Sequence, residues 1–359
     1  MSDISRVVVG LSGGVDSAVA AYLLKKQGYQ VIGVTLRTWE AESGANSRCC
    51  EISDARKVAA QLEIPFYNIN SLPEFREHVT DPFVQAYING MTPNPCVACN
   101  RYIKWERLLA FADEINAEYV ATGHYARIEK TAGGRYTVRQ AASAAKDQTY
   151  MLYQLTQEQL ARTLMPLAEY TKDEVRRIAM DAGLVVAGKK DSQEICFVLD
   201  GGYAEYIDAH YDGKLPPPGN FVDENGNVLG RHKGIINYTV GQRKGLGLAL
   251  GYPAYVKRIE PDTGNVVIGD LESVYESRVL CTEVNFMAVE DIKPGDKERA
   301  FVKIRYHHAA APATLERIDD NTIQVMFDEP VKAPAPGQSA VFYDSENRVI
   351  GGGIIQQNQ

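Results

Sequence analysis

Phosphate binding is the first chemistry that the sequence suggests, because a loop of glycine and serine follows a short apolar run near the N-terminus. Residues 12–17 read SGGVDS and precede the helix-like residues 18–28. Glycines let the backbone approach a phosphate closely, and the helix that follows presents unpaired N–H groups and the positive end of its dipole. Ser12 and Ser17 can donate hydrogen bonds to phosphate oxygens, and Asp16 can place Mg²⁺ or hold the loop.

The loop differs from two common nucleotide-binding patterns. No Lys follows its glycines, so it is not the GxxxxGK(S/T) loop that binds a γ-phosphate, and its spacing is not GxGxxG. It resembles instead the SGGxDS loop of the ATP pyrophosphatase (PP-loop) family. That resemblance implies cleavage of ATP between its α- and β-phosphates and transfer of AMP to a substrate.

Thiol chemistry is the second possibility, since six cysteines occur in a chain that we expect to be cytosolic. A reducing cytosol disfavours structural disulfides, so clustered cysteines indicate metal, redox or nucleophilic chemistry. We interpret Cys281, in a strand-like run, as part of the core, and the adjacent Cys49 and Cys50 as structural. The remaining cysteines are Cys96, Cys99 and Cys196.

An oxygen that leaves as AMP needs a nucleophile to displace it, and thiols are the unusual nucleophiles of this chain. Cys99 forms a CxxC pair with Cys96 and stands before a helix that we expect to begin near Arg101, where a helix N-terminus lowers a thiol pKa. Arg101 and Lys104 add positive charge nearby. Cys196 lies at a polar-to-apolar switch that suggests the edge of a strand or loop. Sulfur transfer is therefore the chemistry that fits best.

Length, composition and charge limit the class of protein. The 359 residues (39.6 kDa) exceed a usual single core, so two or three domains are expected. Hydrophobic residues make up 45% of the chain, yet no apolar stretch is long enough for a membrane helix. The N-terminus lacks the pattern of a secretory signal, which favours a cytosolic protein. A net charge of −8 argues against indiscriminate coating of nucleic acid but permits a shaped RNA on local basic patches.

The periodicity of apolar residues divides the chain into an α/β part and a β part. Strand–helix alternation over residues 1–125 predicts a doubly wound parallel sheet that binds ligands beyond the carboxyl ends of its strands. Capping boxes begin helices at Thr156 and Thr171, and a hairpin turn is expected at Asn225 and Gly226. We predict a PP-loop domain with a helical extension over residues 1–200, a small mostly-β domain over 201–272 and a C-terminal β-barrel over 273–359.

Seven motifs occur in order along the whole chain and carry a specific resemblance. They are SGGVDS (12–17), TPNPCVACN (92–100), ATGHYAR (121–127), KDQTYMLY (146–153), KKDSQEICF (189–197), TVGQRKGLG (239–247) and PGQSAVFY (336–343). Together they resemble the tRNA-specific 2-thiouridylase family (MnmA or TrmU), which makes 2-thiouridine at the wobble position of tRNAs for Lys, Glu and Gln. The resemblance implies tRNA binding by the helical extension and the barrel, a protein that donates persulfide sulfur, and a cytoplasmic monomer without membrane contact.

The resemblance also implies where ATP and Mg²⁺ bind. Magnesium would offset the charge of the pyrophosphate. The residues that match the nucleotide site are Gly10, Leu11, Ser12, Gly13, Gly14, Val15, Asp16, Ser17, Leu36 and Gly123.

Sulfur transfer is implied in the same way. Cys196 matches the cysteine that receives sulfur as a persulfide, and Cys99 matches its partner, which would attack that persulfide to free sulfide or close a disulfide after transfer. A uridine flipped out of the RNA would offer its 2-oxygen to the α-phosphate of ATP, and sulfur would then replace AMP at carbon 2. The residues that match contacts with the target base or the tRNA are Asn94, Pro95, Cys96, His124, Lys146, Asp147, Gln148, Arg305, Tyr306 and Gln338.

Position 96 departs from the best-known branch of the family, which has Asp where this chain has Cys96. Together with Cys99 and Cys196 it could hold a 4Fe–4S cluster with one open iron, an arrangement that related tRNA thiolases use. Cys99 and Cys196 would then be ligands instead of nucleophiles. The sequence leaves both the persulfide relay and the cluster open.

Two functions from other classes are disfavoured. An amide-forming PP-loop ligase, such as an NAD or GMP synthetase, needs an ammonia source or a glutaminase segment, and none is evident. A tRNA-binding protein with a vestigial ATP site would not need the intact SGGVDS loop. Structural roles stay open for Gln338 in a tight turn and for His124 as a loop cap.

Overall fold

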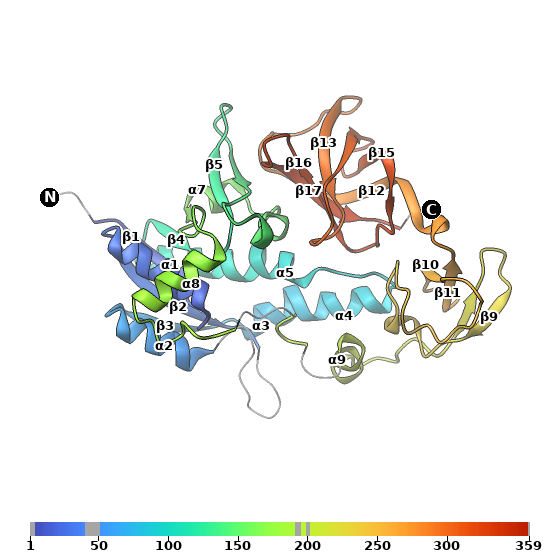
Figure 1. The fold of residues 1–359 in the computed structure, drawn as a ribbon, viewed down its shortest axis with the longest axis horizontal. Coiled ribbons are helices and arrows are strands. Elements are labelled where there is room, and N and C mark those ends of the chain that lie inside the picture. The colour runs from blue at the N-terminus through green and yellow to red at the C-terminus, as the bar shows by residue number, and fades with distance from the viewer. Residues whose placement is uncertain (1–3, 40–50, 191–194, 199–201, 358–359) are drawn as a thin grey trace. The chain divides into compact units, whose positions relative to one another are not determined.

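The computed structural model describes residues 4–39, 51–190, 195–198 and 202–357, and its contacts divide the chain into two compact units (Figure 1). The first unit comprises Met1–Val79, Cys96–Val198 and Glu346–Val349. The second comprises Thr80–Pro95, Leu199–Ser345 and Ile350–Gln359. Cys49 and Cys50, which we interpret as structural, lie outside the described residues.

A parallel five-stranded sheet forms the centre of the first unit, with its strands in the order β3-β2-β1-β4-β7. The strands are β1 Arg6–Gly10, β2 Gln30–Arg37, β3 Phe66–Asn70, β4 Tyr119–Ala121 and β7 Thr163–Leu164. Val7, Val8 and Val9 of β1 are fully buried, because the central strand of a parallel sheet is covered on both faces. The predicted doubly wound sheet is confirmed.

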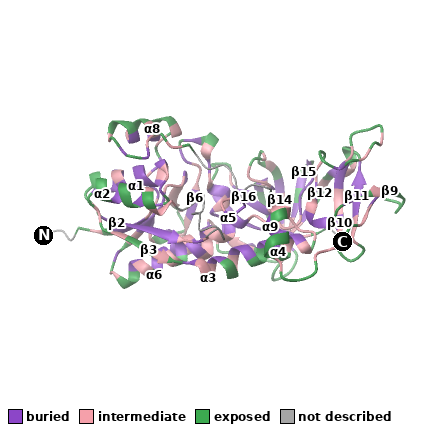
Figure 2. Cartoon of the chain, turned by 90° about the horizontal axis from the view of Figure 1, so that it is seen from below, coloured by how far each residue is buried: buried purple, intermediate pink, exposed green. Residues whose placement is uncertain are grey.

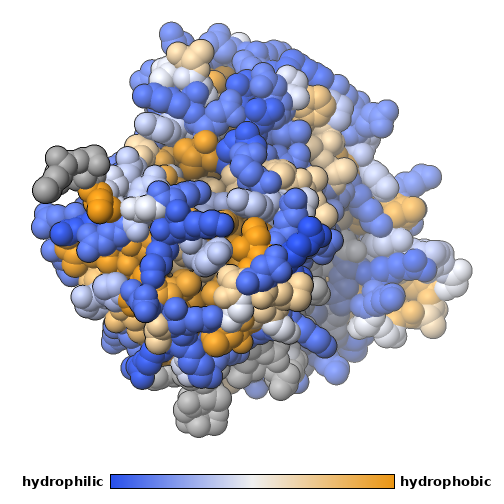
Figure 3. All heavy atoms as spheres, turned by 60° about the vertical axis from the view of Figure 1, so that its left-hand side comes forward, coloured by the Kyte–Doolittle hydropathy of each residue, from blue (hydrophilic) through white to orange (hydrophobic). Residues whose placement is uncertain are grey.

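Helices cover both faces of this sheet. The helices α1 Val15–Lys26, α2 Ile52–Gln61 and α8 Lys172–Asp181 share one core cluster with Val7 and Val9. Helix α6 Glu106–Glu114 contacts β1 and β4 from the opposite face (Figure 2). Figure 2 shows purple, buried strands and helices whose outer sides are green and exposed. Hydrophilic residues dominate the face shown in Figure 3, with smaller apolar groups between them.

Short elements connect these helices and strands. They are α3 Leu72–Phe75, a π-helix Arg76–Thr80, α5 Pro95–Ala98, a π-helix Cys99–Trp105, the hairpin strands β5 Arg127–Lys130 and β6 Tyr136–Arg139, two 3₁₀ turns (Ala144–Lys146 and Thr149–Met151) and α7 Gln157–Ala161. The predicted capping boxes at Thr156 and Thr171 are confirmed and begin α7 and α8. The described helices all lack the length and apolar character of a membrane span.

The second unit contains a four-stranded sheet in the order β10-β11-β8-β9. The strands of this sheet are β8 Asn220–Val222, β9 Val228–Arg231, β10 Tyr255–Glu260 and β11 Asn265–Gly269. The same unit contains the helices α4 Asp81–Ile88 and α9 Tyr203–His210 and a 3₁₀ turn Ile235–Asn237. The predicted hairpin joins β8 to β9, where Gly226 has a φ of 85° and Asp223 accepts hydrogen bonds from the N–H groups of Asn225 and Asn227. This sheet confirms the expected small, mostly-β middle part.

A closed barrel of β12-β15-β14-β13-β16-β17 follows in the second unit. After a 3₁₀ turn Glu272–Val274, its strands are β12 Tyr275–Phe286, β13 Lys297–Lys303, β14 Ala311–Arg317, β15 Ile323–Lys332, β16 Ser339–Tyr343 and β17 Val349–Ile355. Gly353 allows β17 to lie close to β12, because a Cβ there would stand 2.8 Å from the carbonyl oxygen of Thr282. The predicted C-terminal barrel is confirmed.

Cys281 should resist alkylation in the folded protein. It is fully buried in the barrel core, whereas Cys196 is partly exposed. Burial raises the pKa of the Cys281 thiol, and the thiolate is the form that reacts. Peptide mass mapping after iodoacetamide treatment should find Cys281 unmodified in the native protein and modified after unfolding in guanidinium. Labelling of native Cys281 as fast as Cys196 would contradict its place in the core.

Candidate active site

The SGGVDS loop joins β1 to α1 at the carboxyl edge of the sheet, and its two serines organise it. The Ser17 hydroxyl accepts from the N–H of Ser12 at 3.2 Å and donates to the carbonyl of Gly14 at 3.2 Å. The Ser12 hydroxyl lies 3.2 Å from that of Ser17 and accepts from the N–H of Gly14 at 3.3 Å. Gly13 has a φ of 77°, which favours glycine. Leu11, just before the loop, and Val15, within it, are buried.

Asp16 fastens this loop to two other segments. Lys172 Nζ, at the start of α8, donates to both carboxylate oxygens of Asp16 at 2.7 and 2.8 Å. The hydroxyl of Tyr125, in the loop after β4, donates to Asp16 Oδ1 at 2.8 Å. The sequence allowed Asp16 either to place Mg²⁺ or to hold the loop, and these contacts show that it holds the loop.

A cavity of about 210 Å³ opens beside the loop within the first unit. Seven residues that match the nucleotide site line it, namely Gly10, Leu11, Ser12, Asp16, Ser17, Leu36 and Gly123. Four residues expected to contact sulfur or RNA line it as well, namely Cys99, Cys196, His124 and Gln148. Gly13, Gly14 and Val15 belong to the same loop but do not line the cavity. The cavity therefore brings together the expected phosphate loop and both expected reactive thiols.

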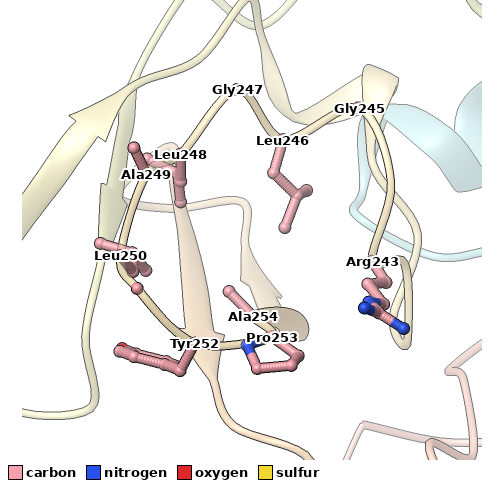
Figure 4. Close-up of a pocket in the computed structure, with 11 residues that line it drawn as sticks. Arg243, Gly245, Leu246, Gly247, Leu248, Ala249, Leu250, Tyr252, Pro253 and Ala254 are labelled. Carbon is pink, nitrogen blue, oxygen red and sulfur yellow. The ribbon is translucent and has the colours of Figure 1, made fainter.

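Two larger cavities in the second unit offer different chemistry. One, of about 490 Å³, follows residues 243–254 of the TVGQRKGLG motif and its continuation, with Arg243 at one end of the loop and Tyr252 toward the other (Figure 4). Another, of about 310 Å³, carries Lys257, Arg258 and Glu276 among mostly apolar residues. The described walls of neither contain a cysteine or a histidine. The smaller cavity in the first unit is therefore the candidate site.

The structure corrects the expected surroundings of Cys99. We expected Cys99 in a loop ahead of a helix that begins near Arg101. Instead α5 passes directly into the π-helix Cys99–Trp105 and then into α6, so Cys99 lies inside a continuous helical segment. The helix N-terminus that would lower its pKa is absent at this position. Lys104, which lines the same cavity, is the nearby cation that the sequence anticipated.

Cys196 is positioned by its neighbours and not by a strand. Its segment is a turn in which the N–H of Val198 donates to the carbonyl of Ile195 at 3.1 Å. Phe197 is 1% exposed and packs edge-on against Phe75, with ring centroids 5.7 Å apart. This anchor in the core fixes the residue beside the cysteine, so the thiol side of the turn lines the cavity.

His124 and Gln148 stabilise the loop that follows β4. His124 Nδ1 lies 2.7 Å from the hydroxyl of Thr122, and its ring lies 5.5 Å from that of Trp105. Burial, and then the positive charge of Lys104, hold the pKa of His124 well below its ordinary value. The side chain of Gln148 accepts from the N–H of Tyr125 at 2.8 Å. Both residues thus cap this loop in addition to lining the cavity.

Three more residues expected to contact RNA lie in the first unit but do not line the cavity. Cys96 is on α5, and Lys146 ends the turn Ala144–Lys146. Asp147 is buried and accepts hydrogen bonds from the N–H and the hydroxyl of Thr149 at 3.2 and 2.9 Å.

The other residues expected to contact RNA belong to the second unit. They are Asn94, Pro95, Arg305, Tyr306 and Gln338. Gln338 Nε2 donates to the carbonyl of Thr92 at 2.8 Å, and a Cβ on Gly337 would stand 3.0 Å from the nitrogen of Thr92. The guanidinium of Arg305 donates to the carbonyl of Val240 at 3.0 Å and also to that of Ala333. Hydrogen bonds within the protein therefore use at least some of the donors of Gln338 and Arg305.

Sequence reasoning missed several residues of the cavity. Val34 and Thr38 lie along β2 and just after it, so the rule that placed Leu36 at the carboxyl edge could have found them. Lys172 does not line the cavity but holds Asp16, which does, and it gave no usable signal because the two residues are 156 positions apart in sequence.

The described residues fit magnesium but not an iron–sulfur cluster. The hydroxyls of Ser12 and Ser17, and the carboxylate of Asp16 that also holds Lys172 and Tyr125, are hard oxygen donors, which Mg²⁺ binds together with substrate phosphates. No three His, Cys, Asp or Glu side chains of the described residues are grouped so that they could hold a metal ion. Cys99 and Cys196 line the cavity, and Cys96 does not.

Comparison with known proteins identifies relatives along nearly the whole chain. Family models match a tRNA methyl transferase HUP domain at residues 5–200, a tRNA methyl transferase PRC-barrel domain at 205–270 and an aminomethyltransferase β-barrel domain at 277–355. The tRNA-specific 2-thiouridylase MnmA of Lachnoclostridium phytofermentans is 53% identical over 98% of this chain and 99% of its own length. That of Clostridium perfringens is 50% identical over 98% of both chains.

A solved structure is similar at a much lower level. The U34-tRNA thiolase NcsA from Methanococcus maripaludis, solved with its 4Fe–4S cluster, is 20% identical over 57% of this chain and 64% of its own, with a TM-score of 0.36.

Gly123→Ala should distort the cavity, because Gly123 forms part of its wall. A Cβ on Gly123 would stand 2.7 Å from backbone atoms of Asp16 and Ser17, which cannot move without shifting the start of α1. We expect ATP affinity to fall about tenfold or more, with a loss of stability of about 1–3 kcal/mol. Isothermal titration calorimetry and urea unfolding measure the two effects. Gly133→Ala is the control, since its nearest neighbour would be 3.7 Å away, and equal effects of the two variants would contradict the prediction.

His124 should make the first unit less stable in mild acid. Its folded pKa is lowered, so below about pH 6.5 the unfolded chain binds a proton that the folded chain does not, and stability falls as the pH falls. His124→Gln should remove up to about 1.4 kcal/mol of this loss per pH unit between pH 6.5 and 5. Urea unfolding followed by tryptophan fluorescence reports on Trp105 beside it. An unchanged pH slope in the variant would refute this assignment.

Proposed function

This chain belongs to the MnmA family of tRNA-specific 2-thiouridylases, and on that basis we propose that it uses ATP to replace the 2-oxygen of the wobble uridine with sulfur in tRNAs for Lys, Glu and Gln. One observation supports this function above the others. The SGGVDS loop and the two thiols Cys99 and Cys196 line the same cavity. Methyl transfer, the activity after which two of the matching domain families are named, would need neither the SGGVDS loop nor the two thiols. Adenylation followed by sulfur transfer uses both the loop and the thiols.

In the first step the loop would bind ATP and the uridine oxygen would attack its α-phosphate. The first turn of α1 offers unpaired N–H groups, and the hydroxyls of Ser12 and Ser17 lie beside them. The new bond joins the uridine 2-oxygen to phosphorus, and the bond to the β-phosphate breaks, so pyrophosphate leaves. Mg²⁺, when bound by these oxygens and the phosphates, would offset the charge of the pyrophosphate. The 2-oxygen is then able to leave as AMP.

In the second step Cys196 would carry the sulfur. Its thiolate attacks the terminal sulfur of a persulfide on a donor protein, which leaves Cys196 as a persulfide and the donor as a thiolate. Cys99 then attacks the inner sulfur of Cys196, forming a Cys99–Cys196 disulfide and releasing hydrosulfide, which displaces AMP at carbon 2. Alternatively, the persulfide attacks carbon 2 first and the disulfide closes afterwards. In both routes a dithiol reductant must return the two cysteines to thiols. Cys99 and Cys196 are both thiols and line the same cavity, which supports pairing them in this relay.

The relay is a better fit than the 4Fe–4S cluster that the sequence left open. A cluster needs three thiolates around one site, and among the described cysteines only Cys99 and Cys196 share the cavity. Cys96 is therefore assigned to the segment next to the target base, together with Asn94 and Pro95, and not to a metal.

The remaining assignments concern the RNA and the state of the protein. We assign RNA contacts to His124, Lys146, Asp147, Gln148, Arg305, Tyr306 and Gln338, as the family resemblance implies. The protein would work as a cytoplasmic monomer that receives sulfur from a donor protein and binds tRNA through the helical extension and the barrel.

The relay predicts different results for three cysteine variants. Anaerobically purified protein should convert transcribed tRNA-Glu to the 2-thiouridine form with ATP and a persulfide donor, and should produce AMP. Cys196→Ala and Cys99→Ala should lower the rate by about 10³-fold or more, because each removes a reacting sulfur. Cys96→Ala removes a side chain assigned beside the target base but no reacting sulfur, so its rate should fall far less, by about tenfold at most. Mass spectrometry of tRNA nucleosides measures the product.

Two results would contradict the proposal. About four irons per chain, with activity lost both in Cys96→Ala and on removal of the iron, would establish a cluster mechanism and refute the relay. No 2-thiouridine with either a persulfide donor or sulfide would refute the thiolase function itself.

A further inference from the structure

Lys189 connects the segment that carries Cys196 to the phosphate loop. Its ammonium donates to the carbonyl of Gly13 at 3.0 Å, to Asp54 Oδ2 at 3.2 Å and to the carboxylate of Glu51. Gly13 is in the phosphate loop, and Glu51 and Asp54 are at the start of α2. The three N–H donors of one lysine thus have three acceptors on two segments that are 135 or more residues away in sequence.

The position of these acceptors sets the direction of the loop peptides. The N–H of Glu51 donates to the carbonyl of Ser12 at 3.2 Å, so donors from outside the loop hold two consecutive carbonyls, those of Ser12 and Gly13. In a trans peptide the next N–H points away from the carbonyl. The N–H of Gly14 accordingly donates to the Ser12 hydroxyl, which lines the cavity. The carbonyls therefore lie on one side of the loop and the groups that can bind an anion on the other.

Charge makes this arrangement dependent on the lysine. Glu51 and Asp54 place two carboxylates close to a loop that is expected to bind phosphates. Hydrogen bonds from Lys57, with contributions from Glu51 and Lys189, lower the pKa of Asp54 to about 2, so its carboxylate is charged at neutral pH. Lys189 is 28% exposed and forms ion pairs with both acids. Without it, Glu51 and Asp54 would lose these ion pairs beside the loop, although Asp54 would keep its ion pair with Lys57.

The backbone of Lys189 is fixed as firmly as its side chain. Its N–H donates to the carbonyl of Val186 at 3.0 Å, and its carbonyl accepts from Arg176 of α8 at 3.2 Å. The neighbouring Lys190 is exposed. Two adjacent lysines of the KKDSQEICF motif therefore have different surroundings, one held against the phosphate loop and one in solvent.

We propose that Lys189 is a positioning residue of the nucleotide site, which holds the carbonyl of Gly13 away from the cavity and offsets the negative charge of Glu51 and Asp54, so that the loop can accept the phosphates of ATP. This role rests on the proposed use of ATP at that loop. It adds a residue from the segment that would carry sulfur to the nucleotide site, although Lys189 itself does not line the cavity.

Lys189→Met tests the proposal, because it keeps the aliphatic stem and removes the charge and the donors. The dissociation constant of Mg·ATP should rise about tenfold by calorimetry, and the amides of residues 11–18 should exchange hydrogen faster in protein without nucleotide. Lys190→Met is the matched control and should change neither quantity more than about twofold. Lys189→Arg, which keeps the charge and several donors, should restore most of the affinity.

The exchange measurement separates this inference from the proposed function. Unaltered exchange in Lys189→Met would overturn the positioning role, whether or not the protein thiolates tRNA. Equal effects of Lys189→Met and Lys190→Met on affinity would overturn it as well, since a general loss of positive charge would then be the cause. If Lys189→Met does not fold, Glu51→Gln provides the second test. This substitution weakens the ion pair that holds the Lys189 ammonium, so the amides of residues 11–18 should exchange hydrogen faster. Unchanged exchange would contradict the proposal.

Discussion

The ion pair between Asp16 and Lys172 is the interaction on which the candidate site depends. Asp16 is in the first turn of α1, Lys172 begins α8, and Tyr125 adds a third bond from the loop after β4. The Lys172 side chain is only 11% exposed, and attraction between charges is stronger where water is scarce. The pair therefore fixes the direction of α1 and of the N–H groups at its start. The cavity beside the loop can keep its shape because three segments meet at this one carboxylate.

Two lysines from the same stretch of chain act on the loop in complementary ways. Lys172 holds the helix side of the loop through a carboxylate, and Lys189 holds its outer side through a backbone carbonyl. Cys196, which lines the cavity, follows Lys189 by seven residues in the sequence. The segment that would carry the sulfur therefore also stabilises the phosphate loop, so the two halves of the proposed reaction share one structural support.

The second unit uses several polar residues for its own stability. Gln338 bonds to the carbonyl of Thr92, two residues before Asn94, and Arg305 bonds to the carbonyl of Val240, in a turn before β10, and to that of Ala333, just after β15. If this surface binds tRNA as proposed, such bonds would hold it in one shape beforehand and lower the entropy lost on binding. A residue that matches an RNA contact in the family can thus be structural as well, and the two roles are compatible.

The amino-acid sequence by itself determined the local features. The SGGVDS loop, the strand–helix alternation, the capping boxes at Thr156 and Thr171 and the hairpin at Gly226 follow from short-range patterns, because each depends on residues close together in the chain. The tertiary structure alone decided the features that depend on distant partners. It placed Cys99 inside a continuous helix, brought Cys196 to the same cavity without Cys96, and paired Asp16 with Lys172 and Gly13 with Lys189. Such pairings have no periodicity or spacing to reveal them, since only the packing of the sheet and its helices brings these residues together.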